Sequence, residues 1–493
     1  MNSEYYKPIE FGAPIPLNNV HAFSVSMPTI QDVIDYEEGN ERSRSFIKSA
    51  YPRIMIHPYI RRITEYLKKE LDISGSHLFM LPNQEAAEVV AFLSKTDPQY
   101  YSFSTYSIAV FPENAEDDAI NYFAFMKHCG LMIFSREAED ILKLLELEVP
   151  VCTEDSDTIF SENKIKNVLF DGYGSGELFI TNSGMNAIYT GYRVITYEAL
   201  KEDKDIIIIL GWAYADTISI FKKCSKDFIM IPNVYDLHTL EHILEKSGKR
   251  VSAIFIETVS NPLIAVPDIP YLYELSRKYS FLIMCDNTFA TPWNVNISNY
   301  CDIIFESLTK YASGAGDVMA GAIFIPSTSR ITVESLTYIK NSYIPLYKRD
   351  LNRLAFLIKD YKERVEQVSK NAYNLVNRLN TVGSIGSVYS VYSPEAKINW
   401  DKIKKNETSF CGVISVVPNC ELSTIYNSLN LPKGPSLGSN FHLVMPYTLL
   451  AHYNETKTED GLAYLDKIGL SPNLLRISVG TDSEDIIIKE FSK

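Results

Sequence analysis

Short, nearly continuous apolar segments that alternate with stretches of helical character fill the middle of the chain. High Ile, Val and Phe content without polar alternation is typical of parallel strands buried on both faces of a sheet. Strands that alternate with helices in this way predict a doubly wound, mostly parallel α/β fold. The expected strands are Leu178–Thr181, Ile206–Leu210, Phe228–Ile231, Ser252–Glu257, Phe281–Cys285, Ile303–Phe305 and Gly321–Ile325.

Polar side chains gather where these strands end. In open α/β sheets the ligand lies beyond the carboxyl ends of the strands, so polar groups there share one edge of the sheet. The sequence therefore predicts a single site along that edge. Its candidate residues are Ser183, Tyr214, Asn261, Asp286, Ser307, Thr309 and Lys310.

Two of these residues indicate a particular cofactor. Lys310 ends the motif Ser307-Leu308-Thr309-Lys310 and precedes the pliable loop Gly314–Asp317. A lysine at a strand end, with hydroxyls just before it, is expected for a Schiff-base lysine whose cofactor carries a phosphate. Asp286 ends another strand and can pair with a protonated pyridine nitrogen. Pyridoxal 5'-phosphate (PLP) needs both groups, so PLP is the predicted cofactor.

The segment Asn182–Met185 lies between a strand and a helical run from Asn186 to about Leu200. A small hydroxyl and a glycine at a helix start leave free amides and the positive end of the helix dipole facing an anion. Ser183, Gly184 and Met185 are therefore candidates for holding a phosphate. A serine that only caps the helix has the same pattern, so this segment alone does not decide between the two.

Two other motifs are weaker. Gly172–Gly176 half-resembles a dinucleotide-binding loop, but it precedes a strand instead of joining a strand to a helix, so we reject a nicotinamide site. His238 and His242 are spaced as a possible metal pair on a helix. Without a third ligand in view, a solvated helix face is the favoured interpretation, and no metal is expected.

The composition narrows the class of protein. A chain of 493 residues exceeds a single core, so two or three domains are expected. The net charge of −14 argues against a nucleic-acid partner. The seven cysteines contain no CxxC pair and indicate reduced thiols. With no signal peptide at Met1–Glu4 and no apolar run of membrane length, a cytoplasmic protein is expected.

We expect four segments. Residues 1–75 form an N-terminal arm and a helix, and residues 76–165 a small α/β insert with strands at Leu78–Leu81, Ser107–Phe111 and Leu131–Phe134. The insert contains no catalytic constellation and is interpreted as structural. Residues 166–345 form the large domain, and residues 346–493 a linker helix and a smaller α+β domain. Arg476, in an apolar strand of that domain, is either snorkelling or holding a carboxylate.

In combination and order, these motifs resemble the Cys/Met-metabolism family of PLP enzymes, which have the fold type I architecture of PLP-dependent transferases. Within that family the opening Gly12–Glu38 is most similar to the long fungal-type cystathionine γ-synthases. The motifs that carry the resemblance are Tyr51-Pro52-Arg53, Ser183–Ile188, Tyr214 with Thr217, Glu257–Pro262, Asp286–Pro292, Ser307–Tyr311, Ser436–Gly438 and Leu475–Gly480.

The resemblance implies roles for individual residues. Lys310 would bind the cofactor aldehyde and move protons, Asp286 would pair with the ring nitrogen, and Tyr214 would stack on the ring and serve as a base. Arg476 would grip the substrate α-carboxylate, with Ser436 nearby. The implied cofactor-binding residues are Ser183, Gly184, Met185, Tyr214, Asn261, Asp286, Ser307, Thr309 and Lys310, together with Tyr51 and Arg53 from the neighbouring subunit.

The resemblance also implies a reaction. The expected activity is γ-replacement, which makes cystathionine from an O-acylhomoserine and cysteine in methionine biosynthesis, by an enzyme that assembles as a homodimer or homotetramer. The alternatives are a cystathionine lyase, a methionine γ-lyase or an O-acetylhomoserine sulfhydrylase on the same site. A non-catalytic scaffold of the same fold is a further alternative, and it is disfavoured because Lys310, Asp286 and Arg476 are all present.

Overall fold

The computed structural model describes residues 4–52, 54–73, 75–91, 95–150 and 153–493. Its centre is a seven-stranded sheet with strand order β6-β12-β11-β10-β9-β7-β8. Only β12 runs antiparallel to its neighbours in this sheet, and the other strand pairs are parallel. The strands are β6 (Gly176–Thr181), β7 (Ile206–Leu210), β8 (Asp227–Ile231), β9 (Val251–Glu257), β10 (Leu282–Asp286), β11 (Ile303–Glu306) and β12 (Gly321–Pro326).

Helices cover both faces of this sheet. Along β7, Ile208 belongs to the core beneath α7, α10 and α11, whereas Ile207 and Ile209 belong to the core beneath α8, α9 and α13. Burial on both faces explains the continuous apolar strands and confirms the predicted α/β class. These helices are α7 (Ser161–Tyr173), α8 (Gly184–Glu202), α9 (Ala215–Cys224), α10 (Leu237–Ser247), α11 (Ile269–Tyr279), α12 (Thr291–Asn294) and α13 (Val333–Ser342).

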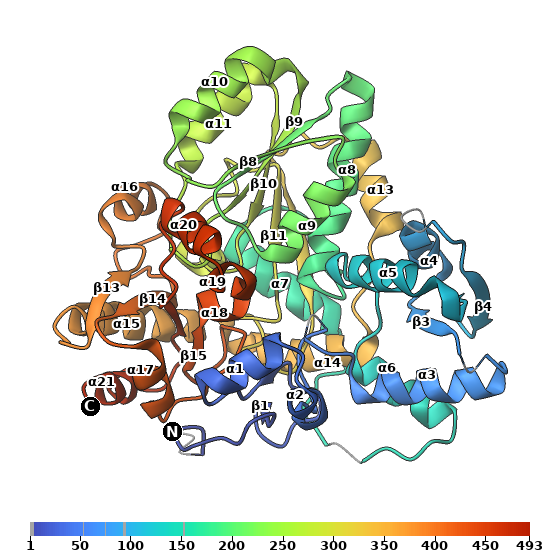
Figure 1. Ribbon diagram of the computed structural model, residues 1–493. Coiled ribbons are helices and arrows are strands. Elements are labelled where there is room, and N and C mark those ends of the chain that lie inside the picture. The colour runs from blue at the N-terminus through green and yellow to red at the C-terminus, as the bar shows by residue number, and fades with distance from the viewer. Residues whose placement is uncertain (1–3, 53, 74, 92–94, 151–152) are drawn as a thin grey trace.

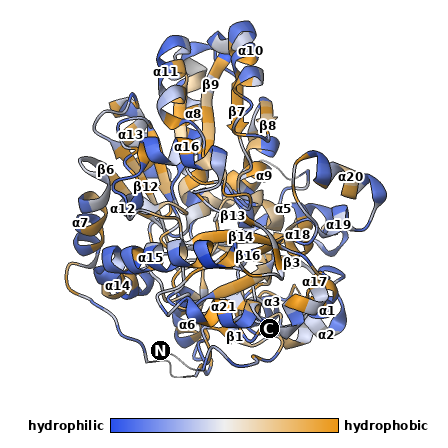
Figure 2. Ribbon diagram, turned by 90° about the vertical axis from the view of Figure 1, so that its left-hand side faces the viewer, coloured by the Kyte–Doolittle hydropathy of each residue, from blue (hydrophilic) through white to orange (hydrophobic). Residues whose placement is uncertain are grey.

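The C-terminal part packs a four-stranded antiparallel sheet, of order β13-β14-β16-β15, against the long helix α15 (Tyr361–Leu379). Figure 2 shows these strands in hydrophobic colours inside the molecule and hydrophilic colours on outer helices. The remaining elements are α14 (Lys348–Leu357), β13 (Ile385–Tyr389), α16 (Pro394–Ile403), β14 (Val413–Pro418), α17 (Leu422–Ser428), β15 (Leu443–Pro446), α18 (Tyr447–Ala451), α19 (Tyr453–Thr456), α20 (Glu459–Lys467), β16 (Leu475–Ser478) and α21 (Asp485–Phe491).

The elements between residues 58 and 144 form a lobe beside the large domain, on the right in Figure 1, and share one apolar core with it. Its antiparallel sheet has the order β3-β5-β4. The expected strand at Leu131–Phe134 is wrong, because this segment is irregular and the carbonyls of Gly130 and Met132 accept hydrogen bonds from the Asn182 side chain instead. The elements are α3 (Pro58–Glu70), β3 (His77–Leu81), α4 (Gln84–Ala91), β4 (Gln99–Phe103), β5 (Tyr106–Phe111), α5 (Glu116–His128) and α6 (Ser135–Leu144).

The N-terminal segment lies across the C-terminal domain of its own chain. Helix α1 contacts α17 and α18, and Figure 1 places α1 and α2 between the C-terminal elements and the lobe of residues 58–144. The Tyr426 hydroxyl donates a 2.8 Å hydrogen bond to the carbonyl of Met27. The elements of this segment are β1 (Pro14–Ile15), β2 (Ser24–Val25), α1 (Ile30–Glu37) and α2 (Glu41–Phe46).

Two negative findings apply to the described part of the chain. None of its helices is both long enough and apolar enough to cross a membrane. Its cysteines are free thiols, as the absence of a CxxC pair predicted, and Cys152 lies outside the described residues.

Candidate active site

Lys310 lies just beyond the carboxyl end of β11 and is partly buried. Its Nζ donates a hydrogen bond to the Tyr51 hydroxyl and lies 3.4 Å from Oγ of Ser436. Burial, reinforced by the positive charge of Arg476 and opposed by Asp286, lowers the pKa of Lys310 to about 7. Near neutral pH a large fraction of this amine is therefore unprotonated, as a nucleophile or a general base requires.

Two carboxyl groups lie side by side at the ends of β9 and β10. Asp286 and Glu257 are direct partners in the parallel register. Burial raises the pKa of both groups, and the neighbouring Asp286 contributes to the increase at Glu257. Glu257 accepts a 2.6 Å hydrogen bond from the Tyr214 amide, and Asp286 accepts one of 2.9 Å from the amide of Thr288. A cation placed against Asp286, such as a pyridinium, would favour its ionised form.

Glu257 is a residue whose function the sequence reasoning missed. It appeared only as part of a motif, although it ends an apolar strand in the same way as Asp286. Its place at the end of an apolar strand was the signal that could have identified Glu257 as a site residue. Through its hydrogen bond to the amide of Tyr214, Glu257 fixes the start of α9 at the edge of the site.

The start of α8 forms an anion cradle. The Ser183 hydroxyl caps the helix by accepting the amide of Asn186 at 3.2 Å. The amides of Gly184 and Met185 then have no partner inside the helix. A side chain at Gly184 would place its Cβ 2.9 Å from Cβ of Ser307, so the backbone of the cradle and that serine are in close contact. This arrangement fits a phosphate group.

Thr309 lies next to this cradle but is already engaged. Its hydroxyl donates to the Ala320 carbonyl at 3.2 Å and accepts from the Ala320 amide at 3.0 Å. The side chain is 3 % exposed. In this structure Thr309 therefore ties the lysine loop to the start of β12, and contact with a phosphate would require one of these bonds to be exchanged.

Arg476 of β16 reaches the site from the C-terminal domain. Its guanidinium donates to Oδ1 of Asn261 at 3.1 Å and to the carbonyl of Ser436 at 2.8 Å. Its Nε is buried and has no hydrogen-bond partner among the described residues. A buried guanidinium with a spare donor is suited to a carboxylate ligand.

Ser436 connects Arg476 to Tyr51. Its carbonyl accepts from Arg476, and its hydroxyl lies 2.7 Å from the hydroxyl of Tyr51. The backbone φ of this serine is +109°, a conformation that side chains other than glycine rarely adopt. Such strain persists only where surrounding contacts hold it, and it is concentrated at functional sites.

Tyr51 and Tyr214 are the two tyrosines predicted for the site. The Tyr51 hydroxyl accepts a hydrogen bond from Nζ of Lys310 within the single chain described. Its expected contribution to a neighbouring subunit stays a prediction. Tyr214 lies at the start of α9, close enough to Arg476 to interact with its charge. Arg53, the other residue expected from the neighbouring subunit, lies outside the described residues.

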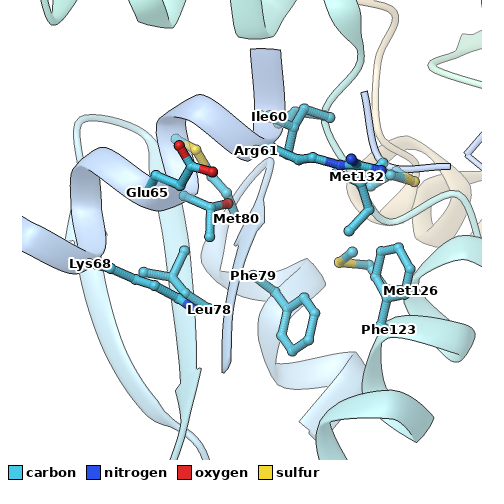
Figure 3. A pocket seen from close by; sticks show the side chains of 13 residues that line it. Ile60, Arg61, Glu65, Lys68, Leu78, Phe79, Met80, Phe123, Met126 and Met132 are labelled. Atoms are coloured by element: carbon cyan, nitrogen blue, oxygen red, sulfur yellow. The ribbon is translucent and has the colours of Figure 1, made fainter. Parts of the chain in front are cut away.

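Two cavities lie away from this site. Figure 3 shows one of about 240 Å³ in the lobe, where Phe79 of β3 and Phe123 of α5 face the α3 side chains Arg61 and Glu65. A polar cavity of about 400 Å³ adjoins Asp317. Within the described residues, no cluster of side chains could hold a metal, and His238 and His242 are exposed on α10.

The sheet topology and the lysine, carboxylate and anion cradle at its edge define a fold type I PLP enzyme. A family model described as "Cys/Met metabolism PLP-dependent enzyme" matches residues 162–493. The chain belongs to this family.

Curated relatives and solved structures extend the match. An L-2-amino-4-chloropent-4-enoate dechlorinase/desaturase of Streptantibioticus cattleyicolor is 29% identical, over 97% of this chain and 96% of its own. A cystathionine gamma-synthase of Saccharomyces cerevisiae is 25% identical, over 98% of each. The structure of a putative O-acetylhomoserine (thiol)-lyase of Campylobacter jejuni, which contains a pyridoxyl-lysine phosphate, has a TM-score of 0.55 and 22% identity over 66% of this chain and 83% of its own.

Proposed function

We propose that the protein makes cystathionine from an O-acylhomoserine and cysteine by γ-replacement. One observation carries the proposal: a lysine amine and a guanidinium with a spare buried donor both contact Ser436. An α-amino acid carries both an amine and a carboxylate, so these two groups can fix its ends. Methionine biosynthesis, a cytoplasmic location and assembly into dimers or tetramers belong to the same proposal.

Each residue has a distinct task in this reaction. Arg476, held by Asn261, binds the substrate α-carboxylate. Lys310 takes the proton from Cα and returns it later, because its amine is largely unprotonated near pH 7. Asp286 holds a positive ring nitrogen, and the amides of Gly184 and Met185 hold the phosphate. When bound there, PLP supplies the electron sink that makes loss of the Cα proton accessible.

The leaving group departs from Cγ, and the thiol of cysteine takes its place. Tyr214 at the start of α9 is the proposed second proton carrier, and its position is fixed by the bond from its amide to Glu257. The carboxylate clamp and the proton carriers serve any amino acid with a leaving group at Cγ. The acceptor therefore decides the reaction.

A second candidate is γ-elimination without a thiol acceptor. It is favoured by the relative that matches nearly the whole chain, whose name describes loss of chloride from carbon 4 of an amino acid. Carbon 4 is the γ carbon, so both reactions expel a group from the same position. Lyase and sulfhydrylase activities belong to the same set of alternatives.

Product analysis distinguishes these reactions. The PLP-loaded protein is incubated with O-acetylhomoserine alone, with cysteine and with sulfide, and the products are identified by mass spectrometry. The proposal expects cystathionine only when cysteine is present. A 2-oxo acid and ammonia without thiol would indicate elimination, and homocysteine from sulfide would indicate a sulfhydrylase. No turnover of any amino acid would favour the non-catalytic scaffold.

A further inference from the structure

We propose that Glu306 is a positioning residue for the cofactor: its buried carboxylate acts through Asp286 and adds a second negative charge for the ring nitrogen of PLP. The proposal rests on the pairing of Asp286 with that nitrogen, and it does not depend on which reaction the protein catalyses. Glu306 is the last residue of β11 and is 2 % exposed. A carboxyl group buried so close to the cofactor edge requires an explanation.

Three neighbouring strands of the central sheet end in a carboxyl group. Glu257 ends β9, Asp286 ends β10 and Glu306 ends β11. Asp286 is the register partner of Phe305, the residue before Glu306. Phe305 packs into the core beneath α8, so Glu306 points to the other face of the sheet. Neighbouring strands lie about 5 Å apart, which brings Asp286 and Glu306 within range of each other's charge.

Two tyrosine hydroxyls hold the Glu306 carboxylate. Tyr173 of α7 donates to Oε2 at 2.6 Å, and Tyr361 of α15 donates to Oε1 at 2.5 Å. The side-chain amide of Asn287 donates to the Tyr173 oxygen at 3.3 Å, which leaves the proton of Tyr173 for Glu306. Each carboxylate oxygen therefore accepts a hydrogen bond, and this arrangement favours the ionised form.

The same cluster is bonded to the segment that carries Asp286. Asn287, the next residue, is fully buried. Its side-chain oxygen accepts from the Thr258 hydroxyl at 2.8 Å, and its backbone amide donates to the Phe305 carbonyl at 2.8 Å. Glu306 is thus connected to Asp286 through a packed hydrogen-bond network as well as through charge.

The Glu306 carboxylate has hydrogen bonds but no positive partner. Within the described part of the chain, no lysine, arginine or histidine forms an ion pair with it. A buried charge is costly unless a cation or good hydrogen bonds compensate it. The two tyrosines provide only the hydrogen bonds. A cation held by Asp286 would supply the opposite charge and would stabilise both carboxylates.

Glu306 can change its charge in the physiological range. Burial raises the pKa of Glu306 to about 7, although the two tyrosine hydrogen bonds lower it, and the charge of Asp286 adds to the increase. The titratable groups that face it are Tyr173, Tyr361 and, through charge, Asp286. Because Glu306 is ionised above this pKa and neutral below it, its contribution to PLP binding should be present at pH 8 and lost at pH 6.

Two ligands separate the effect of charge from the effect of structure. PLP has a ring nitrogen that can carry a positive charge, whereas a carbocyclic analogue has carbon at that position and keeps the aldehyde and the phosphate. Equilibrium dialysis measures the binding of both ligands to the cofactor-free protein. Glu306→Gln is compared with the wild type and with Glu241→Gln, a matched control in which the carboxylate accepts a 2.6 Å bond from Tyr271 between α10 and α11.

Glu306→Gln keeps the size of the side chain and removes its charge. At pH 8 it should weaken PLP binding about tenfold and change binding of the analogue less than about twofold. At pH 6 the variant and the wild type should bind PLP almost equally. Glu241→Gln should bind both ligands as the wild type does. An equal loss of affinity for the two ligands, or no loss for PLP at pH 8, would overturn the proposal.

Tyr361→Phe tests the cluster without changing Glu306 itself. Loss of the hydroxyl removes a bond that lowers the pKa of Glu306, so the carboxylate should ionise at a higher pH. The affinity for PLP, divided by that for the analogue at the same pH, should rise at a pH about one unit higher than in the wild type. Tyr271→Phe should leave this pH unchanged. An unchanged pH in Tyr361→Phe would overturn the role of the cluster.

These measurements follow cofactor binding and need no turnover. A failure of the proposed γ-replacement would appear in the product analysis and would leave the ratio of the two affinities unchanged. A failure of the proposal for Glu306 would appear in that ratio, whichever amino acid the protein converts.

Discussion

Two regions meet at Lys310, and they are built in different ways. At the sheet edge, each functional group ends a strand or follows it by a few residues, as Asp286 ends β10 and Lys310 follows β11. The N-terminal half brings Tyr51 to Ser436, which is 385 positions away in sequence. The functional groups at the sheet edge are therefore positioned by the strands next to them in sequence, whereas Tyr51 reaches the site only through contacts between distant segments.

The forces that hold the two regions also differ. The sheet is buried between two apolar cores, which tolerate small changes by repacking. The lobe shares one of these cores, in which Phe125 of α5 packs against Tyr189 of α8, and it is also held by the buried charges of Arg136, Asp317 and Asp350. Removal of one of these charged partners leaves another unpaired. We therefore expect mutations at the edge to affect chemistry, and mutations in the attachment to affect order and stability.

Lys310→Ala should have the largest effect. Loss of the amine removes both the covalent attachment of PLP and the main proton carrier, so turnover should fall on the order of 10³-fold or more. Lys405→Ala is the control, because this lysine donates to the carbonyl of Gly172 and lies over the Trp293 ring, away from the sheet edge that carries Lys310. Steady-state rates and the visible absorbance of the lysine-bound cofactor check this. If the Lys310 variant had the same cofactor absorbance and the same rates as the wild type, Lys310 would not be the lysine that binds the cofactor.

Arg136→Met should break the attachment and leave the edge intact. Three acidic groups lose their buried cation, and the expected loss is about 3–5 kcal/mol of unfolding free energy. Arg349→Met, whose side chain is 26 % exposed, should cost much less. Urea unfolding measures both, with proteolysis to show whether the lobe is released first. If Arg136→Met unfolded at the same urea concentration as the wild type, buried charge would not contribute to the attachment of the lobe.

Arg476→Lys should weaken substrate binding with a smaller effect on the cofactor. A lysine retains the charge but loses the fork that holds Asn261 and the Ser436 carbonyl. KM should rise about 10–100-fold with unchanged PLP absorbance. Arg378→Lys, a surface pair with Asp485, serves as control. A change in kcat alone would argue against a carboxylate clamp.

Gly130→Ala should weaken PLP binding about tenfold, because its Cβ would displace the Ser183 cap of the cradle. Gly174→Ala is a matched control, since this glycine also has a positive φ but has no atom within 4 Å of the added Cβ. Equilibrium titration of PLP into the cofactor-free proteins compares them. If both alanine variants bind PLP equally weakly, backbone strain explains the loss of affinity, and contact between Gly130 and Ser183 does not.

The capture of PLP by the cofactor-free chain should depend on pH through Lys310. Because the pKa of this amine is lowered to about 7, its reactive neutral form is scarce at pH 6 and dominant at pH 8. The rate at which the visible band forms should rise across this range and then level off. A rate that continues to rise toward pH 10 would indicate an amine with an ordinary pKa.

The sequence was sufficient for the sheet and its edge because both follow from local pattern. Apolar segments predicted the strands, and the strand-end rule brought Asp286, Ser307 and Lys310 to one edge. The roles proposed for the site residues remain predictions. Strand β4 was missed because Gln99 and Tyr100 are exposed, and its segment lacks a continuous apolar run. The strand predicted at residues 131–134 is wrong because apolar content does not reveal where the carbonyls of a segment bond.

The sequence was not sufficient for the position of Tyr51 or for the function of the lobe. No local pattern shows that Arg136, on an amphipathic helix, lies buried against Asp317 beyond the reactive lysine. The strained φ of Ser436 was also invisible, since serine gives no signal for a positive φ. These features arise only when distant segments pack together.

Chemical trapping of the cofactor tests the central claim most directly. The PLP-loaded protein is reduced with borohydride, digested and mapped by mass spectrometry for lysines that carry a pyridoxyl group. The account predicts one modified residue, Lys310, and no modification of Lys433, a buried lysine held by the Pro28 carbonyl. A pyridoxyl group on another lysine, or none at all, would contradict the assignment of this site.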